Sequence, residues 1–265
     1  MLQIEHVSLS YDGGRNYAVK DLSLNLRAGE IFGLLGPNGA GKTTTLKMVT
    51  GILSPNTGRV LVNGHDIIKE PVEAKQSFSY VPDDPNMFLR LKGIEYLNFM
   101  TSIYRLPTEG LSAKIEKLAR DFDLFDRLNE SIQNYSHGMR QKIVLIAALL
   151  HNPPVWILDE PMIGLDPRST YLLKQMMRQH ADQGNLVLFS THVLDVAEKI
   201  CDRIAIIDHG CCVASGTMEE LRQQHQSDDS LEKLFLDLTA DAEEQFNLQA
   251  LEQEAEQVLK ASDEA

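Results

Sequence analysis

Residues 31–43 read IFGLLGPNGAGKT, and this stretch decides the fold class. The apolar run at 31–36 ends in glycine, which is typical of a buried strand. The residues at 42–51, KTTTLKMVTG, have helical spacing and a glycine stop. Residues 36–43 fit the pattern G-x-x-x-x-G-K-[ST], in which glycines let backbone N–H groups face phosphate oxygens that a Cβ atom would block. The sequence therefore predicts a buried strand, a phosphate loop and a helix in succession.

The side chains of this loop predict a nucleoside triphosphate and a divalent cation as ligands. We expect Lys42 to pair with the β- and γ-phosphates and the Thr43 hydroxyl to bind Mg²⁺. A chance glycine-rich turn is the alternative, but the position between a buried strand and a helix argues against it. The loop residues predicted to contact the nucleotide are Gly36, Asn38, Gly39, Gly41, Lys42, Thr43 and Thr44.

Two further apolar runs end in polar side chains. Residues 155–160, VWILDE, end in Asp159 and Glu160, and residues 189–192, FSTH, end in His192. Because adjacent buried carboxylates are costly unless a cation or a reaction needs them, we expect Asp159 to hold Mg²⁺ and Glu160 to deprotonate the attacking water. Ligands of parallel sheets lie at the carboxyl ends of the strands, so we expect His192 to hydrogen-bond the γ-phosphate. Surface carboxylates and a core histidine are the alternatives.

The rest of the chain alternates strand and helix patterns. The runs at 154–161, 185–192 and 203–210 are typical of buried strands, and the residues between them, such as 171–181, have helical spacing. This alternation predicts an α/β fold with a largely parallel sheet.

Three other regions have different patterns. Residues 2–10 and 21–30 alternate polar and apolar positions and are expected to pair as strands. Residues 85–136 have helical patterns and no convincing strand, which predicts a helical insertion. Two apolar helical stripes follow residue 216, which predicts a helical tail packed on its own domain or, alternatively, on a partner. Their members are Leu231, Leu234, Phe235 and Leu238, then Leu248, Leu251, Ala255 and Val258.

Composition excludes several classes of protein. The chain has 265 residues, 43% of them hydrophobic, which suits one large domain or a domain with a smaller insertion. No apolar run approaches the roughly 20 residues needed to cross a bilayer, and the N-terminus lacks signal-peptide features, so we expect a cytosolic protein. Three cysteines, Cys201, Cys211 and Cys212, are too few for a disulfide framework or a zinc site.

The net charge of −13 is unevenly distributed along the chain. From Thr217 onward there are 14 acidic and 3 basic residues, whereas the preceding body has 24 acidic and 22 basic residues. Neither part offers the basic face that nucleic-acid binding usually requires. We therefore expect no nucleic-acid partner.

A second candidate phosphate site occurs at 135–141, YSHGMRQ. Ser136 would cap a helix with Gly138 in its first turn, and the free N–H groups of a helix start favour an anion. The helix continues as KIVLIAALL, so its body should be buried and its start should face outwards. An ordinary serine cap is the alternative. The loop at 36–43 already supplies one phosphate site. These residues alone therefore do not identify the phosphate group that the second site would bind.

Taken in order, the phosphate loop, YSHGM, WILDEP, IGLDP and STH resemble the motifs of ATP-binding subunits of ABC transporters, from Leu2 to about Thr217. The resemblance implies a P-loop NTPase (RecA-like) core with an N-terminal antiparallel β subdomain and an inserted α-helical subdomain. It implies ATP and Mg²⁺ as cofactors and a head-to-tail pair of subunits with two ATP molecules between them. Each ATP would lie between the phosphate loop of one subunit and Ser136, His137 and Gly138 of the other.

The resemblance also implies partners and a location. A separate integral-membrane permease would carry the substrate, and this chain would sit at the cytoplasmic face of the membrane through that permease. The second ATP-binding domain would be another copy of the chain, because this chain carries both a phosphate loop and a usable form of the family's signature motif, YSHGM. A pair of two different chains with unlike half-sites is the alternative.

Three residues outside these loops receive roles from the resemblance. Tyr11 matches the aromatic position that stacks on adenine, with a tyrosine packed on the core as the alternative. Asp83 stands where most members have a glutamine, and its carboxylate would hold Mg²⁺ or a water molecule beside the nucleotide. Asp166 in IGLDP matches the loop that contacts the dimer interface, but Ile163 stands where a small polar residue is common.

The signature also departs from the family pattern. Tyr135, His137 and Met139 replace the usual leucine, glycine and glutamine, while Ser136 and Gly138 remain. His137 would add a donor for the γ-phosphate. The acidic residues after SYVP, the YSxGM signature and the tail SLEKLFLDLT most resemble the bacterial exporter-type branch, which works with six-helix permeases.

The prediction is therefore an ATPase that powers transport, with export favoured. It divides the chain into an ATPase core with the N-terminal β subdomain at 1–84 and 137–216, a helical insertion at 85–136, and an acidic helical tail at 217–265. One alternative is a soluble ABC ATPase that acts on nucleic acid or ribosomes, although such chains usually carry a second cassette or a coiled-coil insertion. Another is a non-catalytic subunit that uses ATP only as a clamp.

Overall fold

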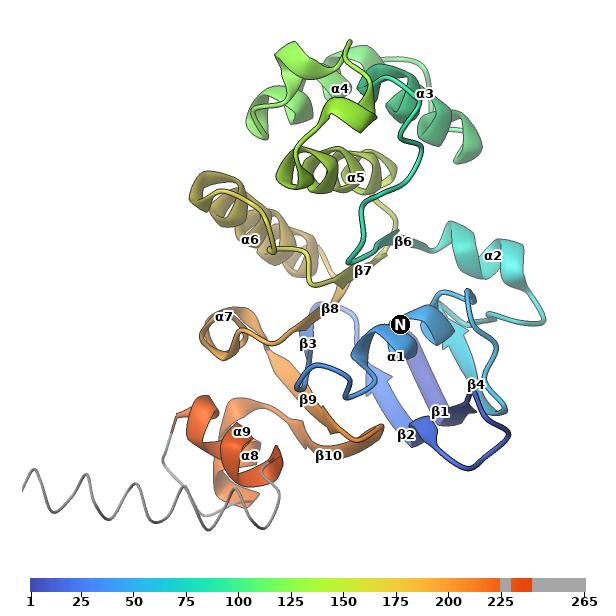
Figure 1. Ribbon diagram of the computed structural model, residues 1–265, viewed down its shortest axis with the longest axis vertical. Coiled ribbons are helices and arrows are strands. Elements are labelled where there is room, and N and C mark those ends of the chain that lie inside the picture. Colours follow the sequence, from blue (N-terminus) through green and yellow to red (C-terminus); the bar gives the residue numbers. More distant parts are fainter. Residues whose placement is uncertain (225–229, 240–265) are drawn as a thin grey trace, which may run out of the picture.

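The computed structural model describes residues 1–224 and 230–239, and a six-stranded sheet forms its middle layer (Figure 1). The strand order is β10-β9-β3-β8-β7-β6, and every neighbouring pair is parallel except β10 with β9. This confirms the predicted α/β fold with a largely parallel sheet. The strands are β3 (Ile31–Leu35), β6 (Phe78–Val81), β7 (Val155–Asp159), β8 (Leu186–Thr191), β9 (Arg203–Asp208) and β10 (Cys211–Gly216).

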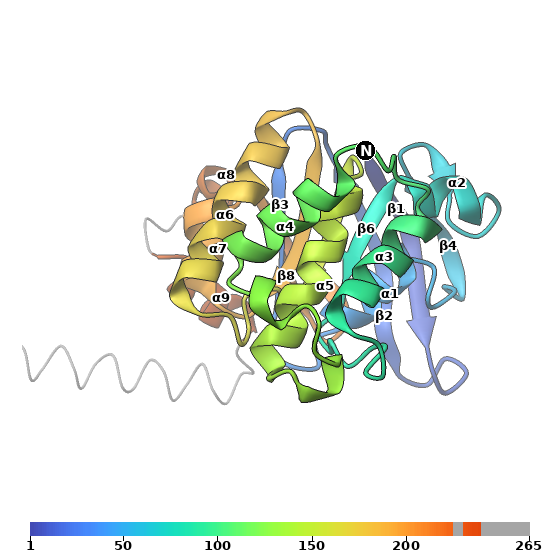
Figure 2. The same ribbon diagram turned by 90° about the horizontal axis from the view of Figure 1, so that it is seen from above.

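Helices lie on one face of this sheet in two layers, as Figures 1 and 2 show. α5 (His137–His151) and α6 (Pro167–Asp182) contact the strands, and α3 (Gly93–Ile103) and α4 (Leu111–Asp121) pack on α5. Every residue of β3, β7 and β8 is buried, because apolar layers contact both faces of these strands. The continuous apolar runs of the sequence follow from this two-sided burial.

The other face packs against α1 (Lys42–Val49) and a second sheet with the order β2-β1-β4-β5. Its strands are β1 (Leu2–Ser10), β2 (Tyr17–Leu26), β4 (Thr57–Val62) and β5 (His65–Asp66), and α2 (Pro71–Gln76) follows them. The antiparallel pairing of β1 with β2 was predicted. The predicted bounds of β2 were wrong, because the strand begins at Tyr17 and ends at Leu26.

Residues 85–136 contain α3, α4 and two short 3₁₀ helices, η1 (Phe125–Arg127) and η2 (Ile132–Asn134). In the described structure this region has no strand and a single isolated bridge, between Lys92 and Ser131. Buried side chains such as Tyr96, Ile115 and Phe122 share a core with α5. The region therefore packs on the helix that begins at the signature.

The C-terminal part adds α7 (Leu194–Ile200), α8 (Met218–Gln224) and α9 (Leu231–Thr239) beside β9. Leu231 and Leu234 are buried against this edge of the molecule, and Phe235 and Leu238 are partly buried there. The first stripe of the tail thus packs on its own chain. The predicted second stripe, Leu248, Leu251, Ala255 and Val258, lies outside the described residues.

Across 1–224 and 230–239, none of the helices has both the length and the apolar character required to span a bilayer. Cys201, Cys211 and Cys212 are free thiols of intermediate exposure. Cys201 and Cys212 are partly buried and pack against the hydrophobic core.

Candidate functional site

The phosphate loop joins β3 to α1 and leaves the first turn of α1 open to a ligand. Gly41 caps the helix with a left-handed φ of 108°, and it has no side chain that could bond to the free N–H groups of that turn. A Cβ atom at Gly36 would collide with the carbonyl oxygen of Ile207. The loop is also tied to the β9–β10 turn, because the N–H of Gly210 donates to the carbonyl of Ala40 at 2.9 Å. Open N–H groups at a helix start suit phosphate oxygens.

The ammonium group of Lys42 lies across this loop. Its Nζ donates to the carbonyl of Gly36 at 2.7 Å and to that of Pro37 at 3.2 Å. The Lys42 residue is only 7% exposed, and its Nζ lies 3.7 Å from Oε1 of Glu160. A buried cation held by carbonyl groups is well placed to exchange them for phosphate oxygens, which carry a full negative charge.

Asp159 and Thr43 form a group that fits a magnesium ion. Asp159 is fully buried at the end of β7, and Thr43 lies beside its side chain. Its Oδ1 accepts from Oγ of Ser190 at 2.6 Å, while its Oδ2 is buried and has no partner within the described part of the chain. Burial raises the pKa of Asp159 above its ordinary value. A hard oxygen-binding cation would satisfy the unpartnered carboxylate oxygen, and Mg²⁺ prefers such oxygen ligands.

Glu160 follows Asp159 in a left-handed conformation, with φ at 46°. Its N–H donates to Oγ of Ser190 at 2.9 Å, so one hydroxyl group fixes both acidic residues. Its carboxylate is 10% exposed and contacts Nδ1 of His192 at 3.0 Å. A non-glycine residue with positive φ is uncommon and is often found at functional sites. The carboxylate thus lies between His192 and Lys42, beside the phosphate loop.

A cavity of about 190 Å³ opens at this point. Asp83, which follows β6, and Ala18, which belongs to β2, complete its walls. The structure therefore brings together most of the predicted phosphate-loop residues with Asp83 and Glu160. The lining residues are Ala18, Pro37, Asn38, Gly39, Gly41, Lys42, Thr43, Thr44, Asp83 and Glu160.

A family model described as "ABC transporter" matches residues 19–163, which is more than half of the chain. The chain belongs to the ABC transporter family. It is an ATP-binding and ATP-hydrolysing subunit that powers transport. ATP-binding subunits of this family pair with membrane permeases.

Individual relatives agree with this assignment. The chain is 35% identical to the ABC-type transporter ATP-binding protein EcsA of Bacillus subtilis, over 85% of this chain and 92% of EcsA. It is 34% identical to the ABC transporter ATP-binding protein NatA of the same organism, over 80% of this chain and 87% of NatA. It is 38% identical to the daunorubicin/doxorubicin resistance ATP-binding protein DrrA of Streptomyces peucetius, over 80% of this chain and 64% of DrrA.

Solved structures show the same fold. An ATP-binding subunit of an ABC transporter superposes with a TM-score of 0.85 at 32% identity, over 90% of this chain and 99% of that one. The ATP-binding cassette MJ0796, solved as a post-hydrolysis dimer with ADP and Pi, gives 0.73 at 23% identity, over 82% and 99% of the two chains. The comparisons support a transport ATPase and not a soluble ATPase that acts on nucleic acid or ribosomes.

The signature of this ABC ATPase lies at the start of α5 and outside the cavity just described. Oγ of Ser136 accepts from the N–H of Met139 at 3.3 Å, so the serine is the helix cap. Ser136 and His137 are exposed, whereas the body of α5 is buried. A Cβ atom at Gly138 would collide with the carbonyl oxygen of Gly164. The loop that follows Glu160 therefore packs directly against the signature of the same chain.

Asp166 has partners within its own chain. It caps α6 by accepting from the N–H of Ser169 at 2.9 Å, and its Oδ2 lies 2.6 Å from Nζ of Lys142. These contacts hold the pKa of the Asp166 carboxyl well below its ordinary value, the Lys142 hydrogen bond first among them. Ile163, in the same loop, is 41% exposed. Asp166 therefore stabilises the start of α6 within its own chain, a role that the sequence does not predict. Its contact with a partner subunit stays a prediction.

The structure also decides three alternatives. Tyr11 is 68% exposed, so it is not packed on the core. The side chain of His192 is 46% exposed and contacts Glu160, so it is not a core histidine. Asp159 and Glu160 are not surface carboxylates, because both side chains are almost completely buried.

Sequence reasoning missed several residues that hold the site together. Ser190 is a polar residue inside a buried strand, and this contrast could have marked it. Ala18, Gly164 and Lys142 gave no such signal, because their contacts depend on how distant segments meet. Tyr11, Ser136, His137, Gly138 and Asp166 do not line the cavity that contains the phosphate loop.

Proposed function

We propose that two copies of this chain bind ATP head to tail, each closing the other's phosphate site with its signature. One observation carries the proposal: the exposed signature at Ser136 and His137 lies outside the chain's own phosphate cavity. That cavity, at about 190 Å³, is smaller than the roughly 300–1,000 Å³ typical of sites that enclose a small-molecule ligand. A second surface is therefore needed to enclose the nucleotide. Tyr11 stacks on the adenine, and Asp166 lies at the interface.

Hydrolysis depends on three side chains that meet at the phosphate loop. Lys42 neutralises the β- and γ-phosphates, Glu160 takes a proton from the attacking water, and His192 hydrogen-bonds the γ-phosphate. Thr43, Asp83 and Asp159 hold Mg²⁺, which neutralises negative charge on the phosphates. The support for this assignment is the unpartnered oxygen of Asp159 beside Thr43, and the contact of Glu160 with both Lys42 and His192.

The transporter is an exporter whose permease is a separate polypeptide, and the chain binds that permease at the cytoplasmic face of the membrane. Support comes from relatives whose names refer to drug resistance, such as DrrA, and to Nod factor export. Residues 1–84 and 137–216 form the ATPase core, residues 85–136 pass motion to the permease, and residues 217–265 form an acidic tail.

The test uses a tagged Glu160→Gln variant, which should trap the ATP-bound pair. The variant is extracted with native membranes in mild detergent, and the proteins that co-purify are identified by mass spectrometry. We expect a multi-helix membrane protein and a stoichiometry of two ATPase chains. A matched control adds Lys42→Ala to Glu160→Gln, which should keep the permease but lose the ATP-dependent contact between the two chains. Co-purification of soluble proteins alone, from an extraction shown to keep other membrane complexes intact, would contradict the proposal.

A further inference from the structure

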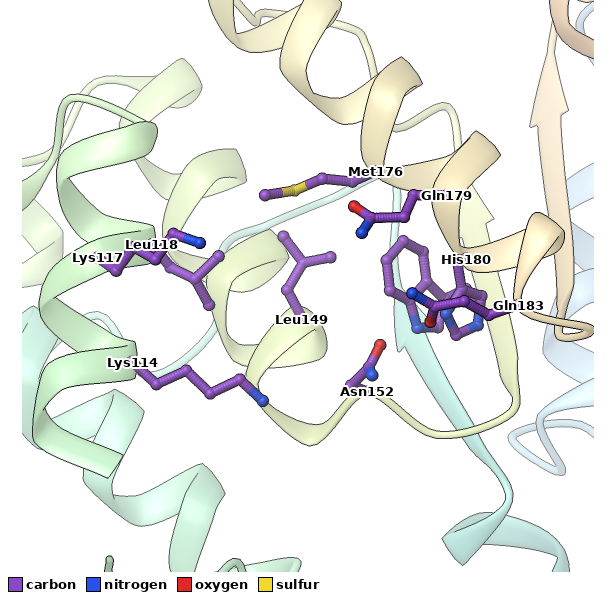
Figure 3. Close-up of a pocket in the computed structure, with 10 residues that line it drawn as sticks. Lys114, Lys117, Leu118, Leu149, Asn152, Met176, Gln179, His180 and Gln183 are labelled. Atoms are coloured by element: carbon purple, nitrogen blue, oxygen red, sulfur yellow. The ribbon is translucent and has the colours of Figure 1, made fainter. Parts of the chain in front are cut away.

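A second cavity, of about 220 Å³, lies between α4 of the helical insertion and α6 of the core (Figure 3). We call it the α4–α6 cavity. The lysines of α4 lie on one side, Gln179, His180 and Gln183 of α6 lie on the other, and Leu149 lies between them. Its lining residues are Lys114, Lys117, Leu118, Leu149, Asn152, Trp156, Met176, Gln179, His180 and Gln183. None of them belongs to the phosphate site.

The α4 wall of this cavity is positively charged. Nζ of Lys114 donates to the carbonyl of Leu150 at 2.9 Å, which leaves two of its three donors for another group. Burial lowers the pKa of Lys114, so an anion beside it would relieve an unfavourable environment. The acidic neighbour Glu116 pairs with Arg120 instead. Among the residues that the structure describes, no acidic side chain lines the cavity, although the whole chain has a net charge of −13.

The opposite wall contains two stacked rings with unsatisfied nitrogens. Trp156 and His180 stack with centroids 3.9 Å apart and an interplanar angle of 14°. Nε1 of Trp156 and Nε2 of His180 are both buried and have no hydrogen-bond partner among the described residues. Burial lowers the pKa of His180 to about 4. The ring is therefore neutral near pH 7, and a hydroxyl group can pair with its Nε2 in either tautomer.

The size of the α4–α6 cavity suits a small ligand. A cavity of about 150 Å³ holds one benzene molecule, so about 220 Å³ accommodates a single ring with one or two substituents. Leu118, Leu149 and Met176 offer apolar contact to such a ring. A hydroxyl group accepts one hydrogen bond and donates another, which matches an indole N–H and a neutral imidazole nitrogen.

We propose that the α4–α6 cavity binds a small aromatic carboxylate that carries a hydroxyl group. The carboxylate contacts Lys114 and Lys117, and the hydroxyl group contacts Trp156 and His180. Because α4 belongs to the insertion and α6 to the core, the bound molecule joins the two and restrains their relative movement.

The test uses the single tryptophan of the chain. Its indole N–H gives one cross-peak in a ¹⁵N–¹H correlation spectrum, which reports directly on this wall of the cavity. The full chain is titrated with 4-hydroxybenzoate, with benzoate, which lacks the hydroxyl group, and with 4-hydroxybenzyl alcohol, which lacks the charge. We expect 4-hydroxybenzoate to move the peak saturably and benzoate to move it less. Because a charged hydrogen bond is lost, we expect the alcohol to bind about tenfold more weakly than 4-hydroxybenzoate.

Two variants show where the carboxylate binds. Lys117→Met keeps the apolar stem of the side chain and should weaken 4-hydroxybenzoate binding about tenfold, for the same reason. Lys75→Met, which changes an exposed lysine of α2, should leave it unchanged. The proposal is wrong if 4-hydroxybenzoate leaves the indole peak in place at millimolar concentration. It is also wrong if the alcohol binds as tightly as the acid, or if Lys117→Met binds as tightly as the unmodified chain.

Discussion

Nδ1 of His192 lies 3.0 Å from Oε1 of Glu160, and the same carboxylate oxygen lies 3.7 Å from Nζ of Lys42. One carboxylate therefore meets a histidine from the end of β8 and a lysine from the start of α1. Since the carboxylate is only 10% exposed, water has limited access to it. These contacts align the acid with the phosphate loop, and the expected effects of substitutions at the site depend on that alignment.

Glu160→Gln should lower the rate of ATP hydrolysis by about 100-fold or more, because a general base contributes roughly 10²–10⁴-fold to a rate. ATP binding should persist, since the amide still fits the site. Phosphate release and equilibrium ATP binding measure the two effects separately. Glu73→Gln, on α2, is the control and should change neither. A Glu160→Gln enzyme with a normal turnover rate would remove Glu160 from the catalytic role.

Asp159→Asn should stabilise the nucleotide-free protein at neutral pH while abolishing Mg²⁺-dependent hydrolysis. Burial raises the pKa of Asp159, so its ionisation costs more in the folded than in the unfolded chain. Its contribution to the free energy of unfolding is present below the unfolded pKa of about 3.9 and is lost as the pH rises through the folded pKa. The gain in melting temperature over the unmodified chain should therefore be clear at pH 7 and shrink towards pH 4. The exposed Asp126→Asn is the control, and an equal gain at both pH values would contradict this account.

His180→Phe should reduce the loss of stability that the protein undergoes as the pH falls from 7 to 5. Burial lowers the pKa of His180 to about 4, so between the ordinary value of 6.5 and pH 4 the unfolded chain binds a proton that the folded chain does not. Stability present above pH 6.5 is thus lost as the pH falls, by on the order of 3 kcal/mol in total. Phenylalanine keeps the stack on Trp156 without titrating. Urea unfolding at pH 7 and pH 5 measures the difference.

The control for that experiment is His209→Gln, because the side chain of His209 is 81% exposed. It should keep the full pH dependence. Buried His151, whose pKa is also lowered to about 4, should leave some acid sensitivity in the His180→Phe variant. If the free energy of unfolding of His180→Phe changes with pH as much as that of the unmodified chain, His180 protonates freely in the folded protein.

Gly138→Ala should abolish ATP-dependent pairing without abolishing ATP binding to one chain. The added Cβ atom would collide with the carbonyl oxygen of Gly164 and displace the exposed signature. Light scattering of the Glu160→Gln protein with and without ATP measures pairing, and equilibrium dialysis measures binding. Gly110→Ala tests backbone strain alone, since Gly110 has a positive φ but an added Cβ atom there would meet nothing within 4 Å. If the Gly138→Ala variant pairs normally, the signature is not part of the dimer interface.

Tyr11→Ala should weaken ATP binding by about 5- to 150-fold, because stacking on a base contributes roughly 1–3 kcal/mol. The side chain is 68% exposed, so its removal should leave the fold intact. Tyr171→Ala removes a tyrosine that is 66% exposed on α6 and should leave the affinity unchanged. Equal affinities of both variants would exclude the stacking role of Tyr11.

Much of the fold follows from continuous apolar runs. β3, β7, β8 and β9 were predicted because strands buried on both faces must be apolar throughout. β4 was missed because its first three residues, Thr57 to Arg59, are exposed and only its second half contributes to the core. The strand forms by pairing with β1 on one side and β5 on the other, which no local pattern predicts.

The site is less predictable than the sheet, because contacts between distant segments complete it. The ends of β7 and β8 indicated that Asp159, Glu160 and His192 lie at one edge, and the structure places Glu160 against His192. Their catalytic roles remain predictions. The pairing of Asp166 with Lys142 was not predictable, since the two residues meet only when α5 and α6 pack side by side.

The single hydroxyl group of Ser190 constrains how this protein can change during evolution. It donates to Asp159 and accepts from the N–H of Glu160, so one substitution alters two neighbouring acidic residues at once. A substitution at position 190 therefore cannot change the hydrogen bonding of one acidic residue and leave that of the other intact. If a duplicated copy of such a chain loses its ATPase activity and persists as the inactive member of a pair, we expect position 190 to be among the first to be substituted.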